Sequence, residues 1–125
     1  MLETRIKTAS LGEFIVNQPV SSFPINERLT CYPKKLWIQE IENPTPIDLT
    51  PREVFALLVL VDNYDEFVPY EKLFYKEHPS NVAIRGLVHD LRRKINDPRC
   101  LIADRQGKIK LTNPDRDEKI IRPAA

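Results

Sequence analysis

The chain has 125 residues, enough for one domain, since a single hydrophobic core usually takes about 100–200 residues. Hydrophobic residues make up 42% of the sequence and charged residues 30%, as in globular proteins rather than disordered or fibrous ones. The longest unbroken apolar run, residues 54–61, is far shorter than the about 20 residues that a membrane-spanning helix needs. We therefore expect a protein that does not cross a membrane.

No group of residues in the sequence is typical of catalysis or metal binding. The two cysteines, Cys31 and Cys100, are far apart and have no metal-ligand spacing, so we expect reduced, buried thiols. Neither of the two histidines, His78 and His89, belongs to a motif that joins a base to a nucleophile or to zinc. The sequence predicts no enzyme, no cofactor and no metal site.

Charge is distributed unevenly along the chain. Residues 40–78 contain nine acidic and three basic residues, a net charge of −6. Residues 81–112 contain eight basic and three acidic residues, a net charge of +5. A basic half is the surface to which a polyanion would bind. A basic helix face that is merely solvated is the alternative.

The first half of the sequence predicts strands. Short runs rich in β-branched and aromatic residues are separated by turns that contain asparagine and proline. The predicted strands are 11–16, 28–32, 35–41 and 47–49. We expect them to form an antiparallel meander of three or four strands.

At Thr50 the hydrophobic period changes from two to 3.6. Thr50-Pro51-Arg52-Glu53 is a capping box with proline at the first helical position, which predicts a helix over 51–62. This helix is apolar on nearly all sides, so we expect it at the centre of the core, with Leu58 among its buried residues. A short helix over 69–77 and a longer one over 81–95 are predicted to follow.

The predicted helix 81–95 has one apolar and one basic side. Its apolar stripe consists of Ile84, Leu87, Val88, Leu91 and Ile95. Its outward row consists of Arg85, His89, Arg92 and Arg93. Asp90 stands beside this row, where it either pairs with Lys94 one turn later or contacts a ligand. Two β runs, 101–103 and 108–112, then predict a hairpin with a basic tip.

The predicted order of elements is a sheet, two helices, a long helix with a basic outer face and a basic hairpin. This is the α+β layout of a winged helix-turn-helix with an N-terminal antiparallel sheet, three helices and a C-terminal hairpin wing. We expect the domain to occupy residues 11–112. Residues 1–10 and 113–125 are expected to be flexible.

Three segments also resemble the OmpR/PhoB-type winged-helix family, the effector domain of bacterial response regulators. They are IDLTPREV at 47–54 with Leu57-Leu58, VPYEKL at 68–73, and IRGLVHDLRRKI at 84–95. The resemblance covers residues 11–112 and implies sequence-specific binding of double-stranded DNA by a bacterial transcription regulator. Helix 81–95 would lie in the major groove and the wing at 104–109 on the backbone or in the minor groove.

The resemblance, together with the charge pattern, gives a set of candidate DNA contacts. These residues are Arg85, His89, Asp90, Arg92, Arg93, Arg105 and Lys108. Arg85 and His89 are expected to reach base edges, because the N-terminal half of a recognition helix penetrates deepest. The other basic residues are expected to contact phosphates, and Asp90 to accept from a cytosine amino group if it contacts DNA at all.

The sequence also departs from the family pattern. Pro69 replaces a usual serine cap, Gly86 replaces a buried valine, and the wing lacks the family's glycine-rich motif. The segment 76–83, which the family uses to touch RNA polymerase or DNA, is shortened, and no receiver domain is present in these residues. We therefore expect a divergent member, either freestanding or cut from a longer regulator.

The resemblance implies a cytoplasmic protein that joins the nucleoid when bound, with RNA polymerase or a regulatory protein as a further partner. We expect a homodimer, because one such module makes few base contacts. The alternative is a winged-helix module that binds a protein and no DNA. Its docking face would be the acidic half, with Asp62, Asp65, Glu66 and Glu71.

Overall fold

The structure, a computed structural model, describes residues 10–43 and 45–112. The first half contains α2 (Leu11–Val16), β1 (Phe23–Pro24), β2 (Leu29–Tyr32), the 3₁₀ turn η1 (Pro33–Lys35), β3 (Trp37–Glu40) and β4 (Ile47–Asp48). The second half contains α3 (Pro51–Asp62), β5 (Val68–Pro69), the 3₁₀ turn η2 (Tyr70–Leu73), α4 (Asn81–Ile95), β6 (Leu101–Ala103) and β7 (Lys108–Leu111). In these ranges no helix combines the length and apolar character that a bilayer crossing requires.

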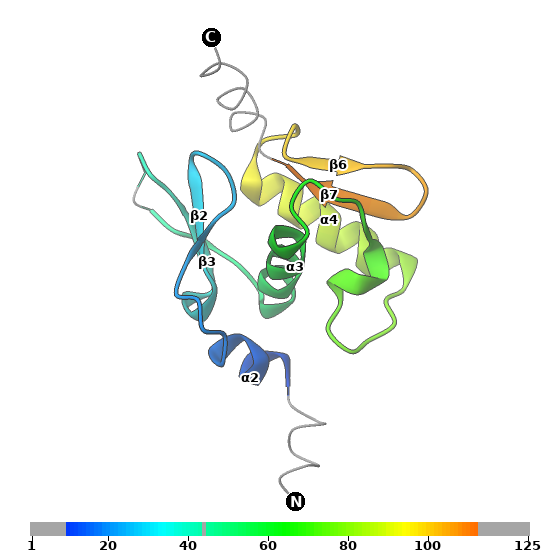
Figure 1. Cartoon of the computed structure of the whole chain (residues 1–125), viewed down its shortest axis with the longest axis horizontal. Coiled ribbons are helices and arrows are strands. Elements are labelled where there is room, and N and C mark those ends of the chain that lie inside the picture. The colour runs from blue at the N-terminus through cyan, green and yellow to red at the C-terminus, as the bar shows by residue number, and fades with distance from the viewer. Residues whose placement is uncertain (1–9, 44, 113–125) are drawn as a thin grey trace, which may run out of the picture.

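Two antiparallel sheets lie on either side of a central helix (Figure 1). The first has the strand order β1-β2-β3-β4 and the second has the order β5-β7-β6. Helix α3 stands between them, with α4 packed beside it and next to the second sheet (Figure 1). The predicted α+β winged helix-turn-helix, with its N-terminal sheet and C-terminal hairpin wing, is confirmed.

Helix α3 has the bounds predicted from its capping box. The Glu53 N–H donates to Thr50 Oγ1 at 3.2 Å, and the Thr50 N–H donates to Glu53 Oε1 at 2.8 Å, which satisfies two amides that a helix start would otherwise leave free. Four apolar side chains of the helix are completely buried. They are Val54, Ala56, Leu57 and Leu60. The prediction of a central helix is therefore confirmed, although Leu58 is only partly buried.

Helix α4 also has its predicted bounds. The Ser80 hydroxyl caps its start by accepting from the Ala83 N–H at 3.1 Å, and Asn96 ends it in a left-handed conformation with φ 55°, a conformation that asparagine tolerates better than most residues. Its inward stripe is buried as the periodicity predicts. The buried residues are Leu87, Val88, Leu91 and Ile95.

The predicted strand over 11–16 is wrong, because this segment forms helix α2. The Ser10 hydroxyl accepts from the Glu13 N–H at 3.1 Å and so caps the helix. Leu11, Phe14 and Ile15 follow the helical spacing of three and four residues, and all three pack on the core. The high β propensity of the segment gave the wrong prediction, since a cap and a core contact outweigh propensity in a segment this short.

The predicted helix over 69–77 is wrong as well. Val68 and Pro69 form β5, which pairs with β7, and only Tyr70–Leu73 turn, as the 3₁₀ turn η2. The Tyr70 N–H, which could have entered a helix, donates instead to the carbonyl of Gly107 in the wing at 3.0 Å. Pairing with the hairpin thus extends the chain where local pattern suggested a helix.

The remaining differences concern strand bounds. The strand predicted over 35–41 begins only at Trp37, because Pro33–Lys35 form η1 and Leu36 takes a left-handed φ of 58°. Strands β1 and β5 have two residues each, too short to give a sequence pattern. The flexibility predicted for 1–10 and 113–125 concerns segments that, apart from Ser10, lie outside the described residues.

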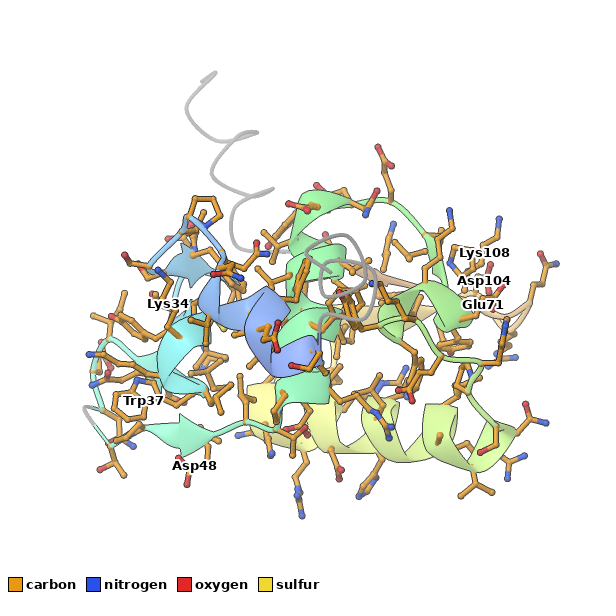
Figure 2. The ribbon with its side chains drawn as sticks, turned by 90° about the horizontal axis from the view of Figure 1, so that it is seen from below. Lys34, Trp37, Asp48, Glu71, Asp104 and Lys108 are labelled. Carbon is orange, nitrogen blue, oxygen red and sulfur yellow. The ribbon has the colours of Figure 1, made fainter. Side chains whose placement is uncertain are left out.

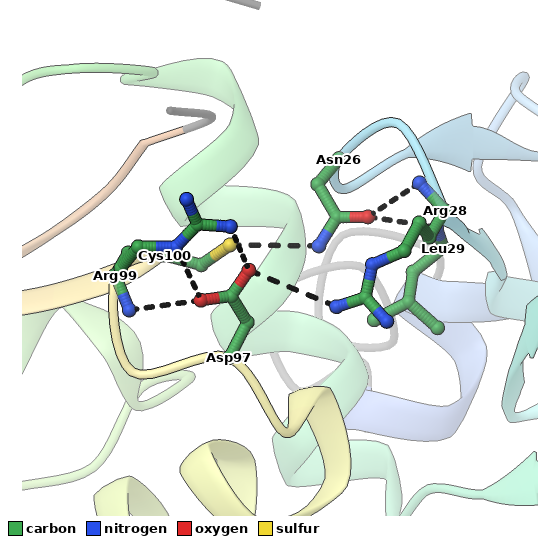
Figure 3. Close-up of polar contacts among 6 residues, drawn as sticks. All are labelled: Asn26, Arg28, Leu29, Asp97, Arg99 and Cys100. Atoms are coloured by element: carbon green, nitrogen blue, oxygen red, sulfur yellow. Dashed lines mark hydrogen bonds and ion pairs between the residues drawn. The ribbon is translucent and has the colours of Figure 1, made fainter. Parts of the chain in front are cut away.

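A polar junction joins the first sheet to the end of α4 (Figure 3). The Asp97 carboxylate, 7% exposed, accepts from Arg99 Nε and Nη2, both at 3.2 Å, and lies 3.7 Å from Arg28 Nη2. Beside it, Asn26 Nδ2 donates to Cys100 Sγ at 3.5 Å. The hydrogen bonds from the Arg99 side chain hold the pKa of the Asp97 carboxyl below its ordinary value.

Truncation of Leu57 should destabilise the protein by about 2–5 kcal/mol, the range for fully buried leucines, because its side chain is completely enclosed at the centre of the core. The same truncation of Leu58, which is partly exposed, should cost clearly less. Urea unfolding of Leu57→Ala and Leu58→Ala measures both values. Equal losses would mean that α3 is rotated about its axis from the orientation described.

The Asp97 junction should stabilise the fold in a pH-dependent way. Because the pKa of Asp97 is lowered in the folded state, its contribution is complete above the unfolded value of about 3.9 and is lost as pH falls through the folded value. The difference in unfolding free energy between wild type and Asp97→Asn should therefore shrink between about pH 5 and pH 2. A difference that stays constant in urea titrations over this range would contradict the assignment.

Candidate nucleic-acid interface

A groove of about 570 Å³ runs between α4 and the wing. Arg85, His89 and Arg92 line it from α4, and Gly107 lines it from the wing tip. Its floor includes Ile84 and Val88 of the same helix. The structure thus places three of the predicted contact residues on one surface that the hairpin borders.

The basic side chains of this groove are free to meet a ligand. Arg85, His89 and Arg92 are all exposed. Within residues 10–43 and 45–112, the side chains of these three residues form no hydrogen bond and no ion pair. Guanidinium groups without an acidic partner carry their full positive charge to the surface, so this groove can bind an anion of extended shape.

Arg93 and Asp90 lie apart from this groove. Arg93 Nη2 is 3.7 Å from Asp90 Oδ1, and Asp90 lines a different groove, between α4 and the start of α3. The predicted pair of Asp90 with Lys94 is wrong, because Lys94 Nζ reaches Glu53 Oε1 at 2.6 Å instead. The predicted outward row is therefore divided, with three members facing the wing and Arg93 beside an acid.

The family pattern predicts a buried residue at position 86, where a glycine would leave a small packing defect, but the structure differs. Gly86 is exposed, it lines the same groove as Asp90, and no atom lies within 4 Å of the place where a Cβ would stand. A larger side chain at this position would point outward, so glycine leaves no packing defect in the core.

The wing carries the two other basic candidates, Arg105 and Lys108. Both are exposed, and the hairpin tip that holds them is at the end of the molecule away from Lys34 of η1 and from Trp37 and Asp48 of the first sheet (Figure 2). The Lys108 position pairs with Pro69 in the second sheet. The wing is therefore attached through β5 to the segment that leads into α4.

Two residues that line the groove were not among the predicted contact residues. Tyr70, in η2, and Asn81, the first residue of α4, both line the groove between α4 and the wing. Tyr70 reaches this position through the bond between its N–H and the Gly107 carbonyl. No local pattern predicts that contact, whereas the position of Asn81, directly after the Ser80 cap, is a local signal that places it at the start of α4.

The described residues offer little for other chemistry. Burial raises the pKa of the Cys31 thiol to about 12 and also raises that of Cys100, so both stay protonated and poorly nucleophilic. In the described ranges no three His, Cys, Asp or Glu side chains are placed to share a metal ion. Phe14 packs against Phe55 and Tyr75, with ring centroids 5.4 and 5.0 Å away, at the edge of the core.

The fold has a known counterpart. The structure resembles that of the response regulator DrrB, an OmpR/PhoB homologue from Thermotoga maritima, with a TM-score of 0.62 and 20% sequence identity. The match covers 86% of this chain and 52% of DrrB, so the chain spans about half the length of that protein. No protein-family model and no curated protein matches the sequence. The chain therefore has an OmpR/PhoB-like winged-helix fold.

Proposed function

We propose that this protein binds double-stranded DNA in a sequence-specific way, as the DNA-binding domain of a bacterial transcription regulator. The observation that carries the proposal is the groove in which Arg85, His89 and Arg92 of α4 lie beside Gly107 of the wing. Helix α4 occupies the major groove, and the tip at 104–109 rests on the backbone or in the minor groove. The winged-helix fold shared with a response regulator supports this assignment.

The geometry of the groove suits this role. An α-helix fits the major groove of B-DNA, where arginine can bind guanine through two hydrogen bonds. Arg85 and His89 are the fifth and ninth of the 15 residues of α4 and lie nearer than Arg92 to its N-terminal end, which penetrates deepest in helix-turn-helix docking. Arg92, one turn further along, and the wing residues Arg105 and Lys108 are placed for the phosphates that flank the site.

The finer parts of the proposal follow from this role. A single module of this size makes few base contacts, so the protein acts as a dimer on paired half-sites. It works in the cytoplasm and joins the nucleoid when bound. RNA polymerase or a regulatory protein is its further partner, and its function needs no enzymatic activity and no cofactor.

A protein-docking module is the second candidate, and one observation favours it. Asp62 at the end of α3, Glu66 in the following loop and Glu71 in η2 are all exposed, so these three carboxylates are accessible to a basic partner. Asp65 is also exposed, but its carboxylate already has a partner, since it accepts from the Thr112 hydroxyl at 2.5 Å.

The salt dependence of duplex binding separates the two functions. A protein that neutralises phosphates displaces counterions, so its affinity falls with a slope of about −0.9 per phosphate contact in a plot of log K against log salt. We expect a slope of about −3 to −5 for this groove and wing, from the same relation. A protein-docking module would show little duplex affinity at any salt concentration, and that result would overturn the proposal.

Alanine variants of α4 should divide into two kinds. Arg85→Ala and His89→Ala should cost about 1–3 kcal/mol on the preferred site and relax specificity at one position. Arg92→Ala should weaken binding to all duplexes about equally and reduce the salt slope by about 1. Arg93→Ala is the matched control, with a smaller effect, because Arg93 faces Asp90 outside the groove.

Gel-shift titrations on the selected site and on a scrambled duplex measure these effects. If neither Arg85→Ala nor His89→Ala changes the ratio of the two affinities, this face of α4 does not read sequence. If Arg93→Ala weakens binding more than Arg92→Ala does, the groove beside the wing is not the DNA site.

A further inference from the structure

The tip of the wing is held together by one acidic side chain. Asp104 Oδ1 accepts from the Gln106 N–H at 2.7 Å and from the Lys108 N–H at 3.0 Å. The Asp104 N–H also donates to the Lys108 carbonyl at 3.1 Å. One carboxylate oxygen therefore accepts both side-chain bonds in the loop that carries Arg105, and a backbone bond closes the loop at its base.

Two residues of this loop have positive φ angles, one of which is unfavourable without compensating hydrogen bonds. Arg105 has a φ of 67° and Gly107 a φ of 93°. The left-handed region is open to glycine but unfavourable for a residue with a Cβ such as arginine. Bonds from Asp104 to the amides on either side of Gly107 compensate for this shape, and the bond from the Tyr70 N–H to the Gly107 carbonyl at 3.0 Å holds the tip against η2.

An acid at this place is otherwise unfavourable for a wing that meets DNA. Asp104 lies in the same turn as Arg105 and Lys108 (Figure 2 labels Asp104 beside Lys108), so its charge repels the phosphates that the neighbouring basic residues attract. In the wing, residues 101–112, it is the one acidic residue. Its two bonds to backbone amides give a physical reason for its presence.

We infer, on the basis of the proposed DNA-binding function, that Asp104 is the positioning residue of the wing. Its carboxylate holds the 105–108 backbone in the shape that presents Arg105 and Lys108 to phosphates, and it does so while weakening the local positive field. The hydrogen bonds of Asp104 therefore favour phosphate binding by the wing, whereas its negative charge disfavours it. Two substitutions of Asp104 separate these two effects.

The first test compares Asp104→Asn with Asp104→Ala in duplex binding. Asparagine keeps an Oδ1 acceptor for both amides and removes the negative charge, so Asp104→Asn should bind a duplex as tightly as wild type or more tightly. Asp104→Ala removes the charge and the bonds together, and it should flatten the salt slope by about 1 to 2, the loss of one or two phosphate contacts. Equal affinity of the two variants would overturn the inference.

Glu71 provides the matched control for charge. It is exposed on η2, next to Tyr70 and near the wing tip (Figure 2), and within the described ranges its carboxylate forms no hydrogen bond or ion pair. Glu71→Gln and Glu71→Ala should therefore behave alike, with unchanged or slightly tighter binding. If Glu71→Ala weakens binding as Asp104→Ala does, the effect at 104 is not specific to the wing loop.

A double-mutant comparison asks whether Asp104 acts through its neighbours. In a chain that already carries Arg105→Ala and Lys108→Ala, the further change Asp104→Ala should not weaken duplex binding, since nothing is left to position. A further loss as large as the one in wild type would show that Asp104 does not act through these two residues, and would overturn the inference.

Hydrogen exchange of the Gln106 and Lys108 amides gives a readout without DNA. Both amides should exchange more slowly in wild type and Asp104→Asn than in Asp104→Ala, while amides of α3 and α4 stay unchanged. Equal rates in wild type and Asp104→Ala overturn the loop assignment whatever the DNA result. Conversely, a wild-type protein that binds no duplex but shows the expected exchange pattern overturns the proposed function and leaves Asp104 as the residue that shapes the loop.

Discussion

The position of α4 depends on one buried carboxylate. Glu53, with a side chain only 3% exposed, accepts from the Thr50 N–H at 2.8 Å and from the Lys94 ammonium at 2.6 Å. The same oxygen atom therefore closes the start of α3 and holds the last turn of α4. A buried ion pair adds little stability compared with an apolar contact of equal volume, but the loss of one partner leaves a charge buried alone and costs about 3–5 kcal/mol. The pair thus ties the last turn of α4 to the start of α3, while the buried stripe Leu87, Val88, Leu91 and Ile95 leaves the basic side of α4 outward.

Long-range contacts then place the wing against that basic side. Asp65 is central to this, since its N–H donates to the Leu111 carbonyl at 3.0 Å and its carboxylate accepts from Thr112. Together with the pairing of β5 with β7, these bonds fix the hairpin to the segment after α3. At the same open end of the hairpin, Arg28 pairs with Asp97 and Asn26 donates to Cys100, which joins the end of α4 to the first half of the chain. At the opposite end, the bond from the Tyr70 N–H to the Gly107 carbonyl holds the tip. The groove beside Arg85 and Arg92 is therefore bordered by a wing held at both ends.

Elements and site residues that depend on local sequence patterns could be predicted, whereas those that depend on contacts between distant residues could not. Helices α3 and α4 were predicted with correct bounds because Thr50 and Ser80 cap them and their apolar residues follow a helical period. The groove residues Arg85, His89 and Arg92 followed from the same period. Helix α2 was missed because Phe14, Ile15 and Val16 have high β propensity, and the cap at Ser10 was not given weight against them. The segment after Val68 was predicted as helix because its partner, Gly107, is distant in sequence. For the same reason Tyr70, which contacts Gly107, was not predicted as a groove residue. Lys94 was paired with Asp90 on its own helix because its actual partner, Glu53, is also distant in sequence.

The central claim is that α4 and the wing together form the DNA-binding surface. It is tested most directly by following backbone amide chemical shifts while a duplex is added to the labelled protein at two salt concentrations. We predict that the largest changes in chemical shift occur in residues 81–92 and 104–109, and that both sets of changes become smaller as the salt concentration is raised. Shifts concentrated in the acidic segment 62–71 or in strands β1 to β4, with α4 and the wing unaffected, would contradict it.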